Sequence, residues 1–75
     1  MEELMSILEE IRPDVDFENE KFLVKDGILE SFDIISIVGA LNDEYDIEIR
    51  PVDLIPENFN SAEAMLAMIK RLQDE

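Results

Sequence analysis

The sequence predicts an all-α fold, a small four-helix bundle with three longer helices and one short helix. Three separate segments repeat apolar residues at spacings of three and four, which places them on one face of a helix. The chain has 75 residues, of which 47% are hydrophobic, so we expect one domain, residues 1–75, with a small core. It contains no cysteine, so no disulfide supports that core.

The first helix is predicted over residues 2–12. Its buried face comprises Leu4, Ile7, Leu8 and Ile11. Arg12 suits the negative end of the helix dipole, and Pro13 ends the helix because it disfavours helical geometry at the residue before it.

A long connection follows, over residues 13–30. A loop of this length in a compact domain is expected to be functional or held against the core. Five apolar residues are available to hold it there, namely Val15, Phe17, Phe22, Leu23 and Leu29.

The second long helix is predicted over residues 31–45. Its buried stripe comprises Ile34, Ile37, Val38, Leu41 and Tyr45. Phe32, Ile35 and Gly39 fall outside that stripe and form a separate, smaller apolar patch near Ser31.

The second connection spans residues 46–59, where Ile47 and Ile49 alternate with charged residues and favour a short extended piece. Pro56 is suited to open a single helical turn that ends near Phe59.

The last helix is predicted over residues 60–73, with Asn60 and Glu63 forming a capping box. Its buried stripe comprises Ala62, Met65, Leu66, Ile69 and Leu72. Lys70 and Arg71 lie near its end, where the helix dipole favours positive charge.

The charge of the chain is strongly acidic, with 20 acidic residues against 6 basic ones and a net charge of −14. Such a chain repels nucleic acid and anionic membranes and attracts basic protein surfaces. Its apolar runs are too short for membrane insertion, and the N-terminus does not resemble a signal peptide. We therefore expect a cytoplasmic monomer.

The composition disfavours catalysis and metal binding. Histidine, the commonest general base, is absent. Acidic residues alternate from position 14 to 20 as in a calcium loop, but Asn19 stands where that loop needs glycine and Lys25 where it needs glutamate. A Ser31 nucleophile paired with Lys21 or Lys25 is conceivable, but no other feature supports it. We expect no metal site and no enzyme activity.

Ser31 is the residue to which chemistry is most readily assigned. A serine at a helix start ordinarily caps the helix by accepting an amide hydrogen bond. The surrounding stretch gives a second interpretation, because it runs Asp26-Gly27-Ile28-Leu29-Glu30-Ser31-Phe32 and continues Asp33-Ile34-Ile35.

That stretch resembles the attachment motif of acyl carrier and peptidyl carrier proteins. In that family an acidic residue precedes a serine and an apolar residue follows it, here Glu30 and Phe32 around Ser31. The resemblance covers nearly the whole chain. It includes Phe17-Glu18-Asn19-Glu20, Tyr45-Asp46-Ile47-Glu48-Ile49, and the segment from Asp53 to Ser61.

The resemblance implies an acyl-carrier-protein-like bundle in which Ser31 receives 4′-phosphopantetheine from coenzyme A, with Asp26, Gly27, Glu30 and Phe32 as motif residues. It implies three kinds of partner: a phosphopantetheinyl transferase, a ligase that loads acyl or aminoacyl groups, and a downstream transferase, each with a basic surface. The expected docking residues are Glu30, Phe32, Asp33, Ile35, Gly39, Asp43 and Asp46.

Several details favour stand-alone carriers over those of fatty-acid synthase. Two residues separate Gly27 from the acidic position, glutamate replaces the usual aspartate, and Ser36 and Asn42 stand where those carriers often have acids. The stretch looks closer to that of the D-alanyl carrier proteins, whose cargo is D-alanine, and of related stand-alone carriers of discrete biosynthetic clusters. The alternative is an acidic helical interaction module without a prosthetic group, in which Ser31 only caps the helix.

Overall fold

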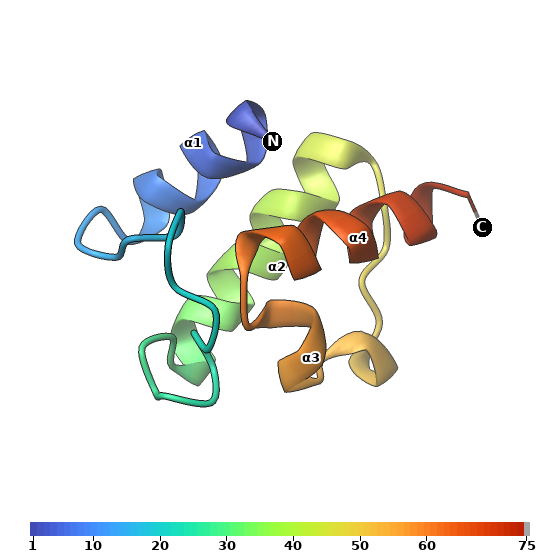
Figure 1. Ribbon diagram of the computed structural model, residues 1–75. Helices are drawn as coiled ribbons and strands as arrows, with labels where there is room; N and C mark the ends of the chain where they lie inside the picture. Colours follow the sequence, from blue (N-terminus) through green and yellow to red (C-terminus); the bar gives the residue numbers. More distant parts are fainter. Residues whose placement is uncertain (75) are drawn as a thin grey trace.

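The computed structural model describes residues 1–74 and contains helices but no strand in that range (Figure 1). The elements are α1 (Glu2–Ile11), α2 (Ser31–Tyr45), the 3-10 helix η1 (Pro51–Asp53), α3 (Pro56–Phe59) and α4 (Ala62–Gln73). The predicted all-α class, three longer helices and one short helix are confirmed. No helix of residues 1–74 has the length and apolar character needed to cross a membrane.

The three longer helices pack against one another in pairs, and α3 packs on α4. Figure 1 shows α4 crossing in front of α2, with the first loop joining α1 to the start of α2. The radius of gyration is 11.1 Å. This arrangement encloses the predicted buried stripes and leaves the first turn of α2 at one end of the molecule.

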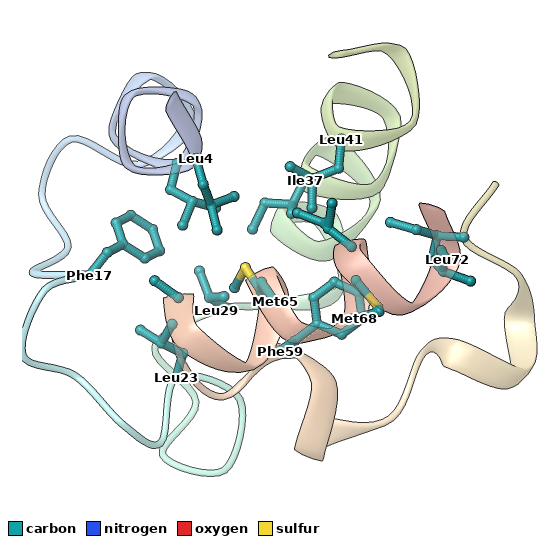
Figure 2. Packing of buried hydrophobic residues seen from close by; sticks show 14 residues of the cluster. Leu4, Phe17, Leu23, Leu29, Ile37, Leu41, Phe59, Met65, Met68 and Leu72 are labelled. Carbon is teal, nitrogen blue, oxygen red and sulfur yellow. The ribbon is translucent and has the colours of Figure 1, made fainter. Parts of the chain in front are cut away.

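The core is built from all the longer helices and from the first loop (Figure 2). Its buried members on the helices include Leu4, Leu8, Ile37, Leu41, Phe59, Ala62, Met65, Met68, Ile69 and Leu72. Apart from Phe59 and Met68, these residues belong to the predicted stripes, because a helix buries positions three and four apart. Met68 is buried although the predicted stripe did not include it. The remaining stripe residues of α1, α2 and α4 are partly buried and pack against this cluster.

The first loop lies against the core as predicted, with one correction. Phe17, Leu23 and Leu29 are buried, and Val15 is partly buried. Phe22, in contrast, is half exposed, and its ring lies 5.5 Å from the ammonium group of Lys25. The prediction that Phe22 pins the loop was therefore wrong.

The start of α4 also differs from the prediction. Ser61 is the N-cap, and its hydroxyl accepts the backbone N–H of Ala64 at 3.1 Å. The predicted capping box of Asn60 and Glu63 is wrong: Asn60 is bonded to the first loop, and Glu63 forms an ion pair with Lys21 at 2.7 Å. Two adjacent residues can both cap a helix, and long-range bonds decide which one does.

The second connection contains two short helices. Pro56 opens α3 and Phe59 closes it, as predicted. η1 was not predicted; it is stabilised by the buried carboxylate of Asp53, which accepts the backbone N–H of Arg50 at 3.1 Å. Between α2 and η1, Ile49 is buried and Ile47 is partly buried, so this piece also covers the core.

Candidate functional site

Ser31 is the first residue of α2, and its side chain is exposed. The N-cap position belongs to Glu30, whose backbone N–H donates to Oδ2 of Asp33 at 3.0 Å. Within residues 1–74 the hydroxyl of Ser31 has no hydrogen-bond partner. Ser31 therefore does not cap the helix, and its hydroxyl remains available at the surface.

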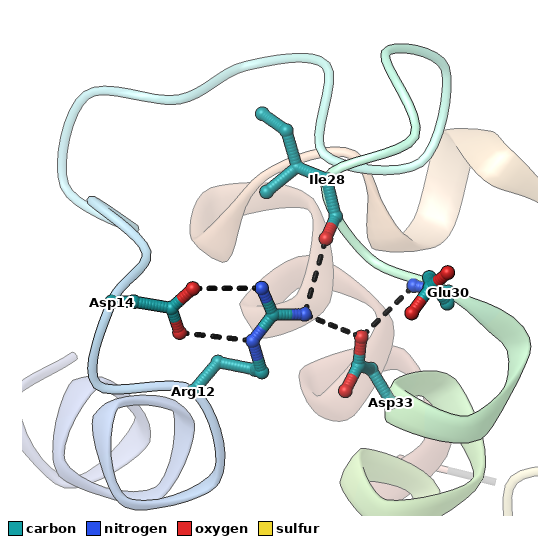
Figure 3. A network of polar contacts seen from close by, with 5 residues as sticks. All are labelled: Arg12, Asp14, Ile28, Glu30 and Asp33. Carbon is teal, nitrogen blue, oxygen red and sulfur yellow. Dashed lines mark hydrogen bonds and ion pairs between the residues drawn. The ribbon is translucent and has the colours of Figure 1, made fainter.

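A charged network includes residues on both sides of Ser31 in the sequence (Figure 3). Nη1 of Arg12, just after α1, donates to Oδ2 of Asp33 at 2.6 Å and to the carbonyl of Ile28 at 3.2 Å. On its outer side, Arg12 binds Asp14 through Nε at 3.0 Å and Nη2 at 2.9 Å. The network links the end of α1, the first loop and the first turn of α2.

The bonds between Arg12 and Asp14 stabilise the charged forms of both side chains. The hydrogen bond from Arg12 lowers the pKa of Asp14 below its ordinary value of 3.8. In turn, the bonds to Asp14 and then to Asp33 raise the pKa of Arg12, so its guanidinium stays protonated throughout the physiological range.

Asp33 was predicted to be a docking residue, but its carboxylate lies inside this network. Only 12% of its side chain is exposed, and Arg12 and the amide of Glu30 occupy the same oxygen. The other predicted acids, Glu30, Asp43 and Asp46, are exposed. Asp33 thus contributes to the geometry of the first turn, and the exposed acids contribute surface charge.

The predicted apolar patch is present on the surface of α2. Phe32 is 79% exposed and Ile35 is 70% exposed, and Gly39 is exposed one turn further along. A contiguous exposed apolar patch is typical of a surface that contacts a partner. The sequence prediction did not include the exposed Val52, Leu54 and Ile55 at and after η1.

An apolar hollow of about 170 Å³ lies between α2 and the second connection. Its lining residues are Val24, Ile34, Leu54, Ile55, Pro56 and Phe59. Ile34 lies one helical turn after Ser31, so the hollow opens beside the first turn of α2. A flexible group attached to Ser31 would have both an exposed origin and an apolar surface within reach.

Gly27 lies in a turn of the first loop that precedes Ser31. Its φ angle is +73°, which side chains other than glycine adopt only with strain, and its N–H donates to the carbonyl of Val24 at 3.0 Å. Asp26 beside it is exposed, and its N–H donates to the carbonyl of Phe22 at 2.8 Å. These residues make the turn that redirects the loop toward α2.

The sequence is similar to that of the D-alanyl carrier protein of Lactococcus lactis subsp. lactis (strain IL1403). The two are 30% identical over 73 residues, which cover 97% of this chain and 87% of that relative. The chain belongs to the carrier protein family. No family model and no solved structure matches it.

For this carrier protein, the sequence predicts a site at Ser31 and its flanking residues and gives Arg12 no part in it. Arg12 was interpreted only as a dipole partner of α1. Its bond to Asp33 spans 21 residues, and no local pattern in the sequence signals a contact of that range. The exposed residues around η1 were missed because scattered apolar residues in a loop equally suit a core contact.

Proposed function

We propose that this carrier protein holds acyl or aminoacyl groups as thioesters on a 4′-phosphopantetheine arm attached to Ser31. The observation that carries the proposal is an exposed, unbonded serine hydroxyl at the first position of α2, preceded by Glu30 in the N-cap position. The amides of a first helical turn and the positive end of its dipole favour a nearby phosphodiester. Ser31 would hold the arm covalently.

The residues around Ser31 fit such a group. The hollow lined by Ile34, Leu54 and Phe59 among others is apolar, and it can shelter part of an arm or a short acyl chain. When attached, phosphopantetheine supplies a terminal thiol that forms thioesters; the chain itself has no cysteine. The protein supplies presentation and partner choice and does not catalyse a reaction.

The partners of this protein are enzymes with basic surfaces: a phosphopantetheinyl transferase, a loading ligase and a downstream transferase. The net charge of −14 accelerates encounter with such surfaces. Phe32 and Ile35 provide exposed apolar contact area next to Ser31. Glu30 provides charge beside Ser31, and Asp43 and Asp46 provide charge at the other end of α2. Val52, Leu54 and Ile55 add exposed apolar area outside the predicted patch, and Leu54 and Ile55 line the hollow with Ile34.

D-alanine is the cargo that the relative's name suggests, and we propose an aminoacyl thioester of this kind for this chain. The small hollow is in keeping with a small cargo, because about 170 Å³ leaves little room for a long acyl chain. The relative also favours a carrier over the alternative, an acidic interaction module without a prosthetic group.

Loading of the modified protein tests the cargo. The protein carrying the arm is incubated with ATP, a D-alanine ligase and labelled D-alanine, with L-alanine and a short fatty acid and its ligase as competing substrates. We expect D-alanine to attach through a bond that neutral hydroxylamine cleaves, as it cleaves thioesters. Loading of the fatty acid alone would contradict the D-alanyl assignment and retain the carrier role.

A further inference from the structure

The guanidinium of Arg12 joins the end of α1 to the first loop and to the first turn of α2 (Figure 3). Its Nη1 atom donates to Oδ2 of Asp33 at 2.6 Å and to the carbonyl of Ile28 at 3.2 Å. The same oxygen of Asp33 accepts the backbone N–H of Glu30 at 3.0 Å. Ser31 thus lies in the sequence between Glu30 and Asp33, which are joined through Oδ2 of Asp33.

This link is better shielded than an ordinary surface ion pair. The side chains of Arg12 and Asp33 are 26% and 12% exposed, whereas those of Lys21 and Glu63, which pair at 2.7 Å, are 49% and 62% exposed. Solvent and salt screen exposed pairs strongly and partly buried pairs much less. The Arg12–Asp33 pair can therefore fix the backbone around Ser31.

The positive charge of Arg12 has a second effect near Ser31. A phosphodiester at Ser31 would be an anion within one helical turn of the carboxylates of Glu30 and Asp33. Like charges at this separation repel, and a bonded guanidinium offsets one of them. Arg12 supplies that offset to Asp33 from within the fold.

We propose that Arg12 is a positioning residue for Ser31: through Asp33 and the Ile28 carbonyl it fixes the first turn of α2 and so sets the rate at which Ser31 is modified. This inference rests on the proposed function. In that reaction Oγ of Ser31 forms a bond to the phosphorus next to the pantetheine of coenzyme A, and the bond to the leaving adenosine 3′,5′-bisphosphate breaks. The hydroxyl proton passes to a base of the transferase.

The rate of such a transfer depends on where Oγ is held relative to the phosphorus. The test measures kcat and KM of a phosphopantetheinyl transferase for the wild type and for Arg12→Gln. Both are assayed at a temperature where circular dichroism shows each protein fully folded. We expect kcat/KM to fall about tenfold, less than the ~100-fold that a 1 Å misplacement of a reacting group can cost.

Two further variants separate positioning from folding stability. Arg12→Lys retains a cation that reaches Asp33, and it should recover most of the lost rate. Asp14→Asn removes the outer partner of Arg12 and leaves the bonds to Asp33 and Ile28. It should retain kcat/KM within about twofold. If Asp14→Asn lowers the rate as much as Arg12→Gln does, the inference is overturned.

Amide hydrogen exchange gives a readout that does not depend on the transferase. In Arg12→Gln the N–H of Glu30 should exchange faster, while that of Leu41 in the buried part of α2 should not change. If the transferase modifies the wild type, and Arg12→Gln has the same kinetics and the same amide exchange as the wild type, this inference alone is overturned. A wild type that an active transferase never modifies would overturn the proposed function itself.

Discussion

The side-chain oxygen of Asn60 accepts the backbone N–H of Val24 at 3.0 Å, across 36 residues of sequence. The same side-chain oxygen also accepts the N–H of Lys25 at 3.0 Å, and the backbone carbonyl of Asn60 accepts the N–H of Leu23 at 2.9 Å. One asparagine between α3 and α4 therefore replaces regular secondary structure for three consecutive residues of the first loop. It holds the part of that loop that leads to Ser31.

Replacing Asn60 by alanine should destabilise the protein substantially. The partly buried backbone N–H of Val24 loses its acceptor, which costs about 2 kcal/mol, whereas the exposed N–H of Lys25 can bond to water instead. For a domain of this size, a loss of about 2 kcal/mol lowers the melting temperature by roughly 10 °C. Thermal unfolding followed by circular dichroism measures the change.

Asn60→Asp is the matched control, because it retains an oxygen acceptor at the same position. It should lower the melting temperature less than Asn60→Ala does. Equal losses in the two variants would show that the side-chain oxygen is not what stabilises the loop.

The two glycines of the chain should respond in opposite directions to alanine. Gly27 has a φ of +73°, so Gly27→Ala should cost about 1–2 kcal/mol through strain alone. Gly39 lies inside α2 with open space around its Cα, so Gly39→Ala should stabilise the protein by about 0.5–1 kcal/mol. Urea unfolding of both variants measures these differences, and a shift of the same sign in both would contradict the account.

Asp53 should stabilise the fold only while it is charged. Its carboxylate is buried between Arg50 at 3.3 Å and Arg71 at 3.4 Å. The backbone N–H of Arg50, and then the side chain of Arg50 and the charge of Arg71, lower the pKa of Asp53 below 3.8. Because the folded pKa is lowered, its contribution is present above the ordinary pKa and is lost as pH falls through the folded pKa.

The measurement is the difference in melting temperature between the wild type and Asp53→Asn across pH. That difference should be constant from about pH 7 to about pH 5 and should shrink below the ordinary pKa, when the wild type also becomes neutral at this position. Glu9→Gln, an exposed change on α1, serves as control. A difference that persists unchanged at the acid end would mean that the charge of Asp53 does not stabilise the fold.

Phe32 should matter for partner binding and little for folding. Its side chain is 79% exposed, so Phe32→Ala should change the free energy of unfolding by less than about 0.5 kcal/mol. Loss of an exposed aromatic anchor from a docking surface costs about 1–2 kcal/mol, so KM for the transferase should rise about tenfold. Phe32→Leu keeps an apolar side chain and should have a smaller effect. An unchanged KM in Phe32→Ala would place the docking surface elsewhere.

Local rules were sufficient for the bounds of α1, α2 and α3. Pro13 follows α1, Asp46 in the left-handed conformation follows α2, and Pro56 opens α3, so each boundary reflects the preference of a single residue. The buried stripes followed from helical periodicity alone. The position of Ser31 at the start of α2 was predictable for the same reason.

Long-range polar contacts were not predictable from local rules. Asn60 and Ser61 are both good capping residues, and only the bond of Asn60 to Val24 decides between them. The sequence favours Arg12 as a partner of the helix dipole and Asp33 as a docking residue, and the structure joins the two in an ion pair. Such choices depend on which segments the core brings together, and sequence spacing does not contain that information.

The most direct test of the central claim is the intact mass of the protein before and after incubation with coenzyme A, magnesium and a broad-specificity phosphopantetheinyl transferase. The wild type should carry one phosphopantetheine group after the reaction, or already before it, and Ser31→Ala should never carry one. A folded wild type that stays unmodified beside a carrier that the same transferase does modify would contradict the account. In that case Ser31 is only the first residue of α2.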